Sequence, residues 1–417
     1  MGLLRPVASF NKNNTYNICI FFLVLQIWNG YDGFWQNGAV LETMVNFLAY
    51  TGNTSRRYNS VIQNGLRDLY SLLEAYGPYP SFDDMAWYGL SYARIYEVIN
   101  NDQFLQTSED IFNWCWKLGW DKTGTCGGGV WFDTNYESKQ TITNAQLLQL
   151  AAKLYRLTNN TSYKTKMNQI YEYVIKNGLI NMTSYKVSDG ATVNCTPDDI
   201  YGPTYNAGVM LGGLAEMYKV TNITGYYELG YKLANGIFDN YCDGNGILVE
   251  PCEPNCDDDA LMYKGIFVRN LRYLIDITDD PARKIYLTSW LNLQVESNLE
   301  HNMCFKVPIK ECNITFKDGP PFFNISGPVF SQDWRGPFSR GNPMQQTSVL
   351  DLLTSAIKPG TVCKGIFCSY DPPVPSPRSL TCNDFPCPSG QDCCEYNNSY
   401  TCCAKGQHCN NSTGICE

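Results

Sequence analysis

Six segments of the chain repeat one plan, and this repetition constrains the fold more than any other feature of the sequence. A polar residue opens a run of small and apolar residues, and a Thr/Asn turn with a nearby Tyr often follows. The openings lie roughly 50 to 85 residues apart, which is enough for two helices and two loops in each repeat. The six segments begin at Asn37, Asp83, Thr143, Tyr205, Asp259 and Met344.

The repeats predict two layers of helices. The opening helices are apolar almost all round and carry Gly and Ala, so we expect them to be buried and closely packed. The segments between them, such as residues 163–177, are amphipathic and suit an outer layer. Inner and outer helices that alternate six times describe an all-α fold, an (α/α)6 toroid, over residues 31–362.

The apolar run at residues 18–28 allows two interpretations. It is too short to span a bilayer comfortably, and with Arg5 and Lys12 upstream it fits the core of a signal peptide. No clear small-residue cleavage site follows it. The toroid also needs a sixth outer helix, which residues 16–29 could supply. Residues 1–30 are therefore either a signal peptide or the closing helix of the toroid.

Cysteine content and glycosylation sequons indicate an exported protein. The chain has 19 Cys, many in close pairs, which predicts disulfides and an oxidising compartment. The predicted toroid keeps eight of them, an even number. We expect a secreted or extracellular protein, or alternatively one of the endolysosomal lumen. The sequons include Asn53, Asn159, Asn160, Asn181, Asn194, Asn222, Asn313, Asn324, Asn397, Asn410 and Asn411.

Charge and histidine content exclude several classes of function. The net charge is −9 and no basic patch is present, so we expect no nucleic-acid partner. Only two His occur, His301 and His408, and the second lies in the Cys-rich tail. Ser-His-Asp and Cys-His sites need a His, and zinc sites usually need several. Acid–base chemistry therefore falls to carboxylates, and we expect neither a metal nor a cofactor.

Asp83 and Asp84 are adjacent at a helix start, beside Phe82, Trp87 and Tyr88. Retaining glycoside hydrolysis uses two carboxyl groups about 5 Å apart, one as nucleophile and one as proton donor. Two close carboxylates also raise one pKa, and a helix N-terminus favours the ionised partner. The alternative is a plain N-cap followed by a first-turn acid. Magnesium-dependent diphosphate chemistry is disfavoured, because Trp87 stands where that motif would place its second acid.

Five motifs carry a resemblance to a known family. They occur in family order, each at the head of an inner helix, and lie at Ser81–Leu90, Cys126–Trp131, Ile142–Ala145, Thr204–Leu214 and Tyr263–Arg269. From about residue 25 to about residue 358 the chain resembles glycoside hydrolase family 76, the endo-α-1,6-mannanases. The resemblance implies an (α/α)6 toroid, an α-mannan polysaccharide as substrate, Asp83 as nucleophile and Asp84 as general acid/base.

Further residues are candidates for binding sugar. The Gly-rich loop that ends at Trp131 lacks the Lys-Ser/Thr of a phosphate loop, and the resemblance implies that it brings Trp131 to the cleft as a stacking surface. Polar residues at the heads of inner helices could bond sugar hydroxyls or merely cap the helices. Lys264 and Arg269 could instead pair with the acids at 257–259. The predicted substrate-binding residues are Trp87, Trp131, Asn144, Tyr205, Asn206, Asp259 and Lys264.

The C-terminal region forms a separate unit. Residues 363–380 contain the Pro-rich stretch 372–377 and predict a stiff linker. Residues 381–417 contain eight Cys, which allow 105 disulfide connectivities, and faintly resemble granulin. We expect a small disulfide-rich module that stabilises the protein or contacts a glycan, a cell surface or another partner.

Three functions fit these features. The first is an endo-acting α-1,6-mannanase. The second is a transglycosylase of the same family type, which moves glycan chains between cell-wall acceptors and differs in how it excludes water. The third is a glycan-binding protein without turnover, against which the intact pair Asp83 and Asp84 argues.

Deletion of residues 372–417 should leave the cleavage of short soluble mannan oligosaccharides largely unchanged, because none of the six helix openings lies in the tail. If the tail binds glycan or a cell surface, its loss should slow action on insoluble walls alone, since tethering raises only the local concentration. Initial rates of full-length and truncated protein on both substrates test this. An equal loss on both, with the helical domain still folded, would show that the tail helps to build the cleft.

Overall fold

The computed structural model describes two compact units, each treated separately below. Unit 1 contains Pro80–Ala86 and Phe112–Ala356, and unit 2 contains the remaining described residues. The run at 18–28 and the stretch 372–377 lie outside the described residues, so both interpretations of the N-terminal segment stay open. The structure describes residues 33–52, 56–192, 194–198, 202–305, 312–313, 328–358, 361–364, 367–370, 393–396, 399–403, 407–410 and 415–416.

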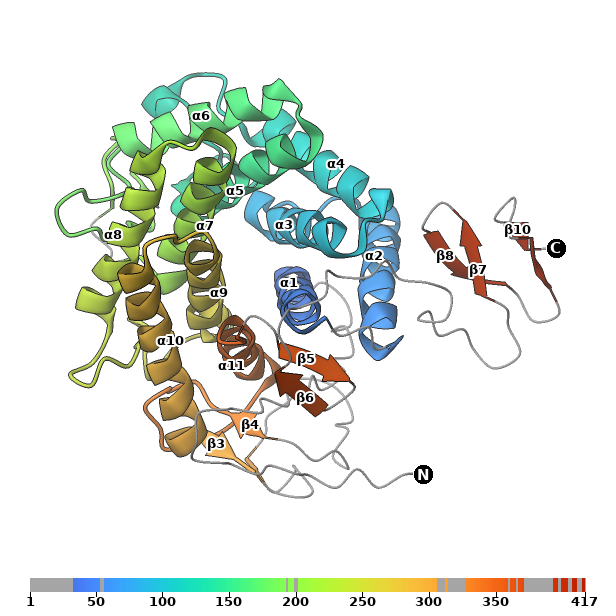
Figure 1. Cartoon of the computed structure of the whole chain (residues 1–417). Helices are drawn as coiled ribbons and strands as arrows, with labels where there is room; N and C mark the ends of the chain where they lie inside the picture. Colours follow the sequence, from blue (N-terminus) through green and yellow to red (C-terminus); the bar gives the residue numbers. More distant parts are fainter. Residues whose placement is uncertain are drawn as a thin grey trace. The chain divides into compact units, whose positions relative to one another are not determined.

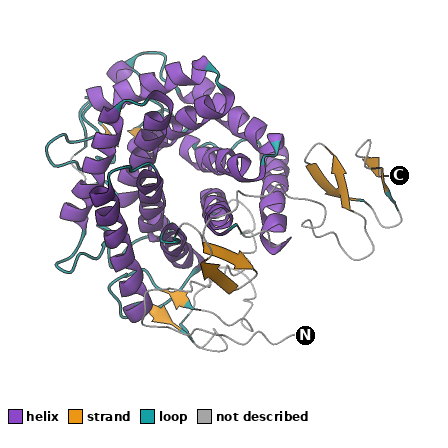
Figure 2. Ribbon diagram, in the orientation of Figure 1, coloured by secondary structure: helices purple, strands orange, loops and turns teal. Residues whose placement is uncertain are grey.

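Helices dominate both units, and strands are short (Figure 2). Within the described residues no helix is both long and apolar enough to cross a membrane. The helices are α1 (Phe34–Thr51), α2 (Arg56–Tyr76), α3 (Phe82–Ile99), α4 (Asp102–Gly119), α5 (Thr141–Thr158), α6 (Thr161–Lys176), α7 (Thr204–Thr221), α8 (Thr224–Tyr241), α9 (Tyr263–Asp276), α10 (Pro281–His301) and α11 (Pro343–Ser355), with short 3-10 turns η1 (Thr125–Gly127) and η2 (Ala260–Met262).

Unit 1 has the predicted two layers. The inner helices α5, α7, α9 and α11 pack side by side in chain order, while α6 packs on α5 and α8 packs on α7 (Figure 1). Fourteen of the eighteen residues of α5 are buried, against five of the sixteen residues of α6. Each of the six predicted segments begins within a few residues of an odd-numbered helix or, for Asp259, just before η2.

The inner helices of unit 1 meet at glycines. A Cβ atom built on Gly208 of α7 would lie 2.6 Å from the Cα atom of Phe267 on α9. One built on Gly265 of α9 would lie 2.5 Å from the Cα atom of Ser348 on α11. Side chains cannot occupy these positions without separating the helices, which explains why the inner segments are rich in small residues.

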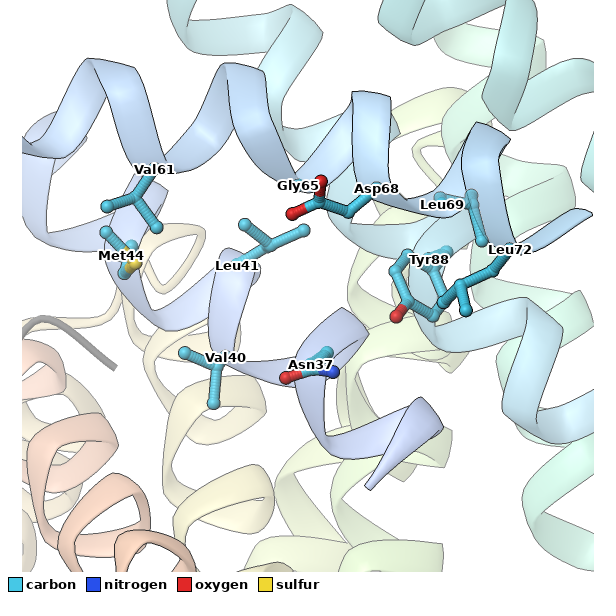
Figure 3. A pocket seen from close by; sticks show the side chains of 10 residues that line it. All are labelled: Asn37, Val40, Leu41, Met44, Val61, Gly65, Asp68, Leu69, Leu72 and Tyr88. Atoms are coloured by element: carbon cyan, nitrogen blue, oxygen red, sulfur yellow. The ribbon is translucent and has the colours of Figure 1, made fainter. Parts of the chain in front are cut away.

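In unit 2, α1 and α2 pack together around a small apolar pocket (Figure 3). Two polar side chains, Asn37 and Asp68, stand among the apolar ones. The apolar lining consists of Val40, Leu41, Met44, Val61, Leu69, Leu72 and Tyr88, together with Gly65.

The strands form two-stranded antiparallel pairs. In unit 1, β1 (Lys139–Gln140) pairs with β2 (Gly190–Ala191), and β3 (Met303–Cys304) with β4 (Val329–Phe330). The tail contains three more pairs, which are β5 (Thr361–Lys364) with β6 (Phe367–Tyr370), β7 (Cys393–Tyr396) with β8 (Ser399–Cys402), and β9 (Cys409–Asn410) with β10 (Ile415–Cys416). The first of these hairpins covers part of the stretch that the sequence predicts as linker.

Three disulfides are present in unit 1, namely Cys126–Cys195, Cys252–Cys256 and Cys304–Cys312. The other two of the eight toroid cysteines, Cys115 and Cys242, are free thiols. The predicted toroid thus has an even number of cysteines, but only six of the eight form disulfides. Cys115 is fully buried and donates a weak hydrogen bond of 3.6 Å to the carbonyl of Phe82.

Replacement of Gly208 by Ala should lower the free energy of unfolding by about 1–3 kcal/mol, because the new methyl group collides with the backbone of α9. Gly225→Ala is the matched control, since Gly225 lies exposed near the start of α8 and a Cβ atom there would meet only the Ile223 side chain, at an ordinary contact distance of 3.9 Å. That change should alter stability by less than about 1 kcal/mol, toward greater stability. Urea unfolding of the two variants measures the difference, and equal effects would contradict the close approach of α7 and α9.

Candidate active site

Asp83 and Asp84 lie in the first turn of α3. The Ser81 hydroxyl donates a hydrogen bond to Oδ1 of Asp83, and Nε2 of Gln146 on α5 donates to the Asp83 carbonyl at 3.2 Å. Asp83 is buried, with 7% of its surface exposed, whereas Asp84 is half-buried. Two elements far apart in the sequence therefore hold the acid pair in place.

Burial sets the protonation of the two carboxyls. It raises the pKa of Asp83 to about 6, and hydrogen bonds from Ser81 and from backbone amides oppose the rise. Burial also raises the pKa of Asp84 to about 9, with further increases from the negative charges of Asp83 and Asp259. At neutral pH the pair therefore holds one ionised carboxylate and one proton-bearing acid. This is the combination that a nucleophile and a proton donor require.

A third acid and two tyrosines belong to the same site. Asp259 is exposed just before η2, and its charge raises the pKa of both Asp83 and Asp84. The ring of Tyr205 stacks on that of Tyr263, with 3.9 Å between centroids and 9° between planes. Burial raises the pKa of Tyr205 most, the neighbouring phenol of Tyr263 comes second, and the charge of Asp83 adds to both. Burial also raises the pKa of Tyr263 most, and the charge of Asp259 adds to it.

Sequence analysis did not select Tyr263. Tyr263 is the first residue of α9, and several of the residues that were selected also lie at the start of an inner helix. The motif Tyr263–Arg269 contained the signal, but aromatic residues are common at buried positions in this chain. Only the stacking on Tyr205 distinguishes it from those.

Asn206 lies fully buried in the first turn of α7. Its amide nitrogen donates to Oδ1 of Asp189 at 2.8 Å, while its amide oxygen has no protein partner among the described residues. The buried carboxylate of Glu250 accepts hydrogen bonds from the backbone N–H and the hydroxyl of Thr204, at 2.9 and 2.5 Å. Burial raises the pKa of Glu250 to about 7. Glu250 therefore caps α7, and the free acceptor of Asn206 remains for water or substrate.

Asn144 is used by the protein itself. Its oxygen accepts from the backbone N–H of Val130 at 2.8 Å, and its nitrogen donates to the carbonyls of Val130 and Gln140 at 3.1 and 2.9 Å. These bonds engage both ends of the amide. Asn144 therefore fastens the Gly-rich loop to the start of α5, and Trp131 follows directly after the fastened residue.

The Gly-rich loop requires its glycines. Gly127, Gly128 and Gly129 have φ angles of 78°, 114° and 90°, which side chains rarely adopt. A Cβ atom on Gly128 or Gly129 would also collide with Trp120 at 2.8 Å or Tyr173 at 2.6 Å. The loop leads to Trp131, which is half-buried and whose backbone N–H donates to the Gly119 carbonyl at 2.9 Å.

Trp87 and Lys264 are both buried within protein. Trp87 is 2% exposed, and its ring packs 5.5 Å from that of Trp35 in unit 2. Lys264 forms an ion pair with Glu253 and donates to the Gln332 carbonyl at 2.8 Å. Lys264 thus takes Glu253 as its partner, where the sequence left the acids at 257–259 open as alternative partners. Arg269 forms an ion pair with Asp351 at 3.7 Å.

An all-α fold with an unequal carboxyl pair at a helix head is compatible with a glycoside hydrolase, and the comparison with protein families identifies which family. The profile of glycosyl hydrolase family 76 matches residues 7–306. The chain belongs to this family. A Schizosaccharomyces pombe protein provisionally named as a mannan endo-1,6-α-mannosidase is 32% identical over 58% of this chain and 59% of its own length. Mannan endo-1,6-α-mannosidase DCW1 of Candida glabrata is 28% identical over 78% of this chain and 72% of its own length.

A solved structure supports the fold. It is an α-1,6-mannanase of Salegentibacter sp. HEL1_6, in an inactive variant with two consecutive aspartates replaced by asparagine, in complex with α-1,6-mannotriose. The TM-score is 0.64 at 19% identity, over 78% of this chain and 89% of that one. The predicted fold class, an all-α toroid, is confirmed. The chain spans about three fifths of the length of the S. pombe relative.

The raised pKa of Asp84 predicts a pH-dependent stability. The unfolded chain loses this proton near the ordinary value of 3.8, and the folded protein keeps it until about pH 9. The folded state binds more protons in this window, so the free energy of unfolding falls as the pH rises through it. Asp84→Asn removes the titrating group. Its melting temperature should therefore fall less than that of the wild type from pH 5 to pH 9, and should be the higher of the two at pH 9.

Asp110→Asn is the control for this measurement, because Asp110 is an exposed acid on α4. Its melting temperatures should follow those of the wild type across the same pH series. A constant offset between Asp84→Asn and the wild type at every pH would contradict the raised pKa.

Proposed function

We propose that the chain is a retaining, endo-acting glycoside hydrolase that cleaves α-1,6-mannosidic linkages in mannan. The observation that carries the proposal is the unequal pair at the head of α3, in which the pKa of Asp83 is about 6 and that of Asp84 about 9. In water both carboxyls would ionise near the same low pH. Burial and neighbouring charge separate them, so one is an anion and the other an acid at neutral pH.

The two carboxyls have complementary roles in this mechanism. Asp83 attacks the anomeric carbon and forms a covalent mannosyl ester, while Asp84 gives its proton to the departing glycosidic oxygen. Asp84, now ionised, takes a proton from water, and the resulting hydroxide adds to the anomeric carbon. The bond to Asp83 breaks, and both residues return to their starting protonation. Two inversions at the same carbon retain the α configuration.

Several observations support this substrate and this pair. The relatives are named for mannan endo-1,6-α-mannosidase activity. The Salegentibacter structure binds α-1,6-mannotriose and is inactive with two consecutive aspartates replaced, and Asp83 and Asp84 are also consecutive. The proposal draws the linkage from these relatives, because nothing in the carboxyl pair itself selects one glycosidic bond.

We assign direct sugar contacts to four of the predicted binding residues. Asp259 and Tyr205 share the electrostatic environment of the acid pair, Asn206 retains a free acceptor, and Trp131 is half-buried. The other three predicted residues act indirectly in this proposal. Asn144 fastens the loop before Trp131, Lys264 holds the turn at Glu253, and Trp87 packs inside the protein, so we assign no sugar contact to these three.

We further propose that the protein is exported and glycosylated. The three disulfides and the exposed sequons at Asn181, Asn194 and Asn222 support this assignment. We propose that the Cys-rich tail contacts glycan or cell surface, as its composition suggests.

Purified protein should cleave linear α-1,6-mannan to shorter chains whose new reducing ends form first as the α anomer, as proton NMR would show. Asp84→Asn should lower kcat by about 10²–10⁴-fold, and Asp83→Asn by at least as much. Because both carboxyls are needed in the same chemical step, the double variant should be scarcely slower than either single variant. The pH–rate profile should rise near pH 6, as Asp83 ionises, and fall near pH 9, as Asp84 loses its proton.

Mannosyl fluoride separates the two roles. Fluoride leaves without a proton, so this substrate should restore the first step in Asp84→Asn and not in Asp83→Asn. Asp110→Asn serves again as the control and should match the wild type. Full activity in both single variants would contradict the mechanism. A β anomer formed first would contradict retention of configuration. Products longer than the substrate would indicate transglycosylation.

A further inference from the structure

Lys139 has a buried ammonium group close to the candidate site. It is the first residue of β1, two positions before α5, and only 3% of its surface is exposed. The group donates to Oδ2 of Asp121 at 2.6 Å and to the carbonyls of Thr125 and Gly128 at 2.7 and 2.6 Å. These three bonds use all the N–H donors that a lysine has. The ammonium is therefore held at one point.

The three partners belong to the stretch that precedes Trp131. Thr125 and Gly128 flank the turn at Cys126, and Asp121 follows the end of α4. Glycines contribute no side chains with which to anchor this loop, and its own backbone N–H groups bond to the carbonyls of Gly124 and Thr125, at 2.8 and 3.3 Å. Asn177 holds the carbonyl of Cys126 at 2.9 Å. Lys139 supplies two such bonds from one atom.

The same ammonium faces the indole of Trp131. It lies 4.4 Å from the centroid of the ring, within the range of a cation–π interaction. Tyr136 meets this ring edge-on, with 6.3 Å between centroids and 80° between planes. The cation occupies one face of the indole, so a further ligand must approach the other face. Trp131 is half-buried as a residue, so part of its surface remains accessible.

A buried ion pair is a costly structural anchor. Removing two charges from water is costly, and apolar side chains of similar volume often stabilise a fold equally well. The charge of Lys139 does more than apolar packing could, because from a single point it bonds two carbonyls and faces the ring of Trp131, with the ring of Tyr173 farther away at 5.8 Å. Precise placement of Trp131 is what this arrangement provides.

We propose that Lys139 is a positioning residue for Trp131, and that it fixes the indole so that its free face receives the apolar face of a mannose ring. The inference rests on the proposed function, because that function makes Trp131 a sugar-stacking residue. Lys139 itself touches no substrate and acts only through the ring and the loop. Loss of Lys139 should therefore weaken substrate binding and leave the chemical step almost unchanged.

The test measures kcat and KM on α-1,6-linked mannooligosaccharides for Lys139→Met, Trp131→Ala and the double variant. Each single change should raise KM about tenfold and alter kcat by less than about threefold. Because Lys139 acts through Trp131, the double variant should match Trp131→Ala. If the two increases in KM multiply in the double variant, or if Lys139→Met lowers kcat instead, the proposal is overturned.

Lys153→Met is the matched control. Lys153 is a buried lysine of α5 that pairs with Glu216 at 3.5 Å and lies 5.2 Å from the Tyr273 ring. Lys153 lies about 18 Å along the helix from the start of α5, far from the Gly-rich loop. Its loss therefore measures the effect on KM of removing a buried cation elsewhere in the protein. We expect the KM of Lys153→Met to equal that of the wild type. A matching increase in KM would show a general structural effect and overturn the role of Lys139.

Asp121→Asn provides a second variant if Lys139→Met does not fold. It keeps an acceptor for the ammonium and removes the opposing charge, and it should raise KM in the same direction by a smaller factor. An unchanged KM in folded Asp121→Asn would count against the proposal. Wild-type protein that neither binds nor cleaves the oligosaccharides would overturn the proposed function and this inference with it, whereas active wild type with an unaffected Lys139→Met overturns the inference alone.

Discussion

The close approach of the inner helices is the constraint on which the rest of unit 1 depends. At Gly208 and Gly265 the backbone of the next inner helix lies where a side chain would otherwise begin. Helices packed this closely hold their heads in a fixed relation, because a dense interior leaves little room for adjustment. The heads of α3 and α7 and the turn before α9 then bring Asp83, Tyr205 and Asp259 into one electrostatic environment.

That packing also separates the pKa values of the acid pair. A carboxyl group removed from water resists ionisation, and the two members of the pair resist it to different degrees. Asp83 accepts hydrogen bonds from Ser81 and from backbone amides, which favour its anion. Asp84 instead faces the charges of Asp83 and Asp259, which favour its protonated form. Two chemically identical residues, adjacent in the chain, thereby differ in protonation at neutral pH.

Much of the fold, and the place of the acid pair at a helix start, could be predicted from the sequence. The six helix heads lie within a few residues of their predicted positions, because the change from polar to apolar residues at a helix start is a local signal. The roles of individual polar residues were harder to predict. Asn144 binds the backbone of Val130, and Lys264 binds Glu253, and neither partner can be chosen from a local pattern. Lys139 gave no signal at all, since its partners lie 11 to 18 residues before it on an irregular loop.

The sequence by itself determined the helical period, the two layers, the family motifs and the position of the acid pair. Each of these depends on residues close together in the chain. Only the tertiary structure decided which acid keeps its proton, which cysteines pair, and which polar helix heads are used by the protein itself. The physical reason is that a pKa and a hydrogen-bond partner depend on burial and on groups distant in sequence, as Asp84 and Asp259 illustrate. Those distances exist only once the inner helices have packed.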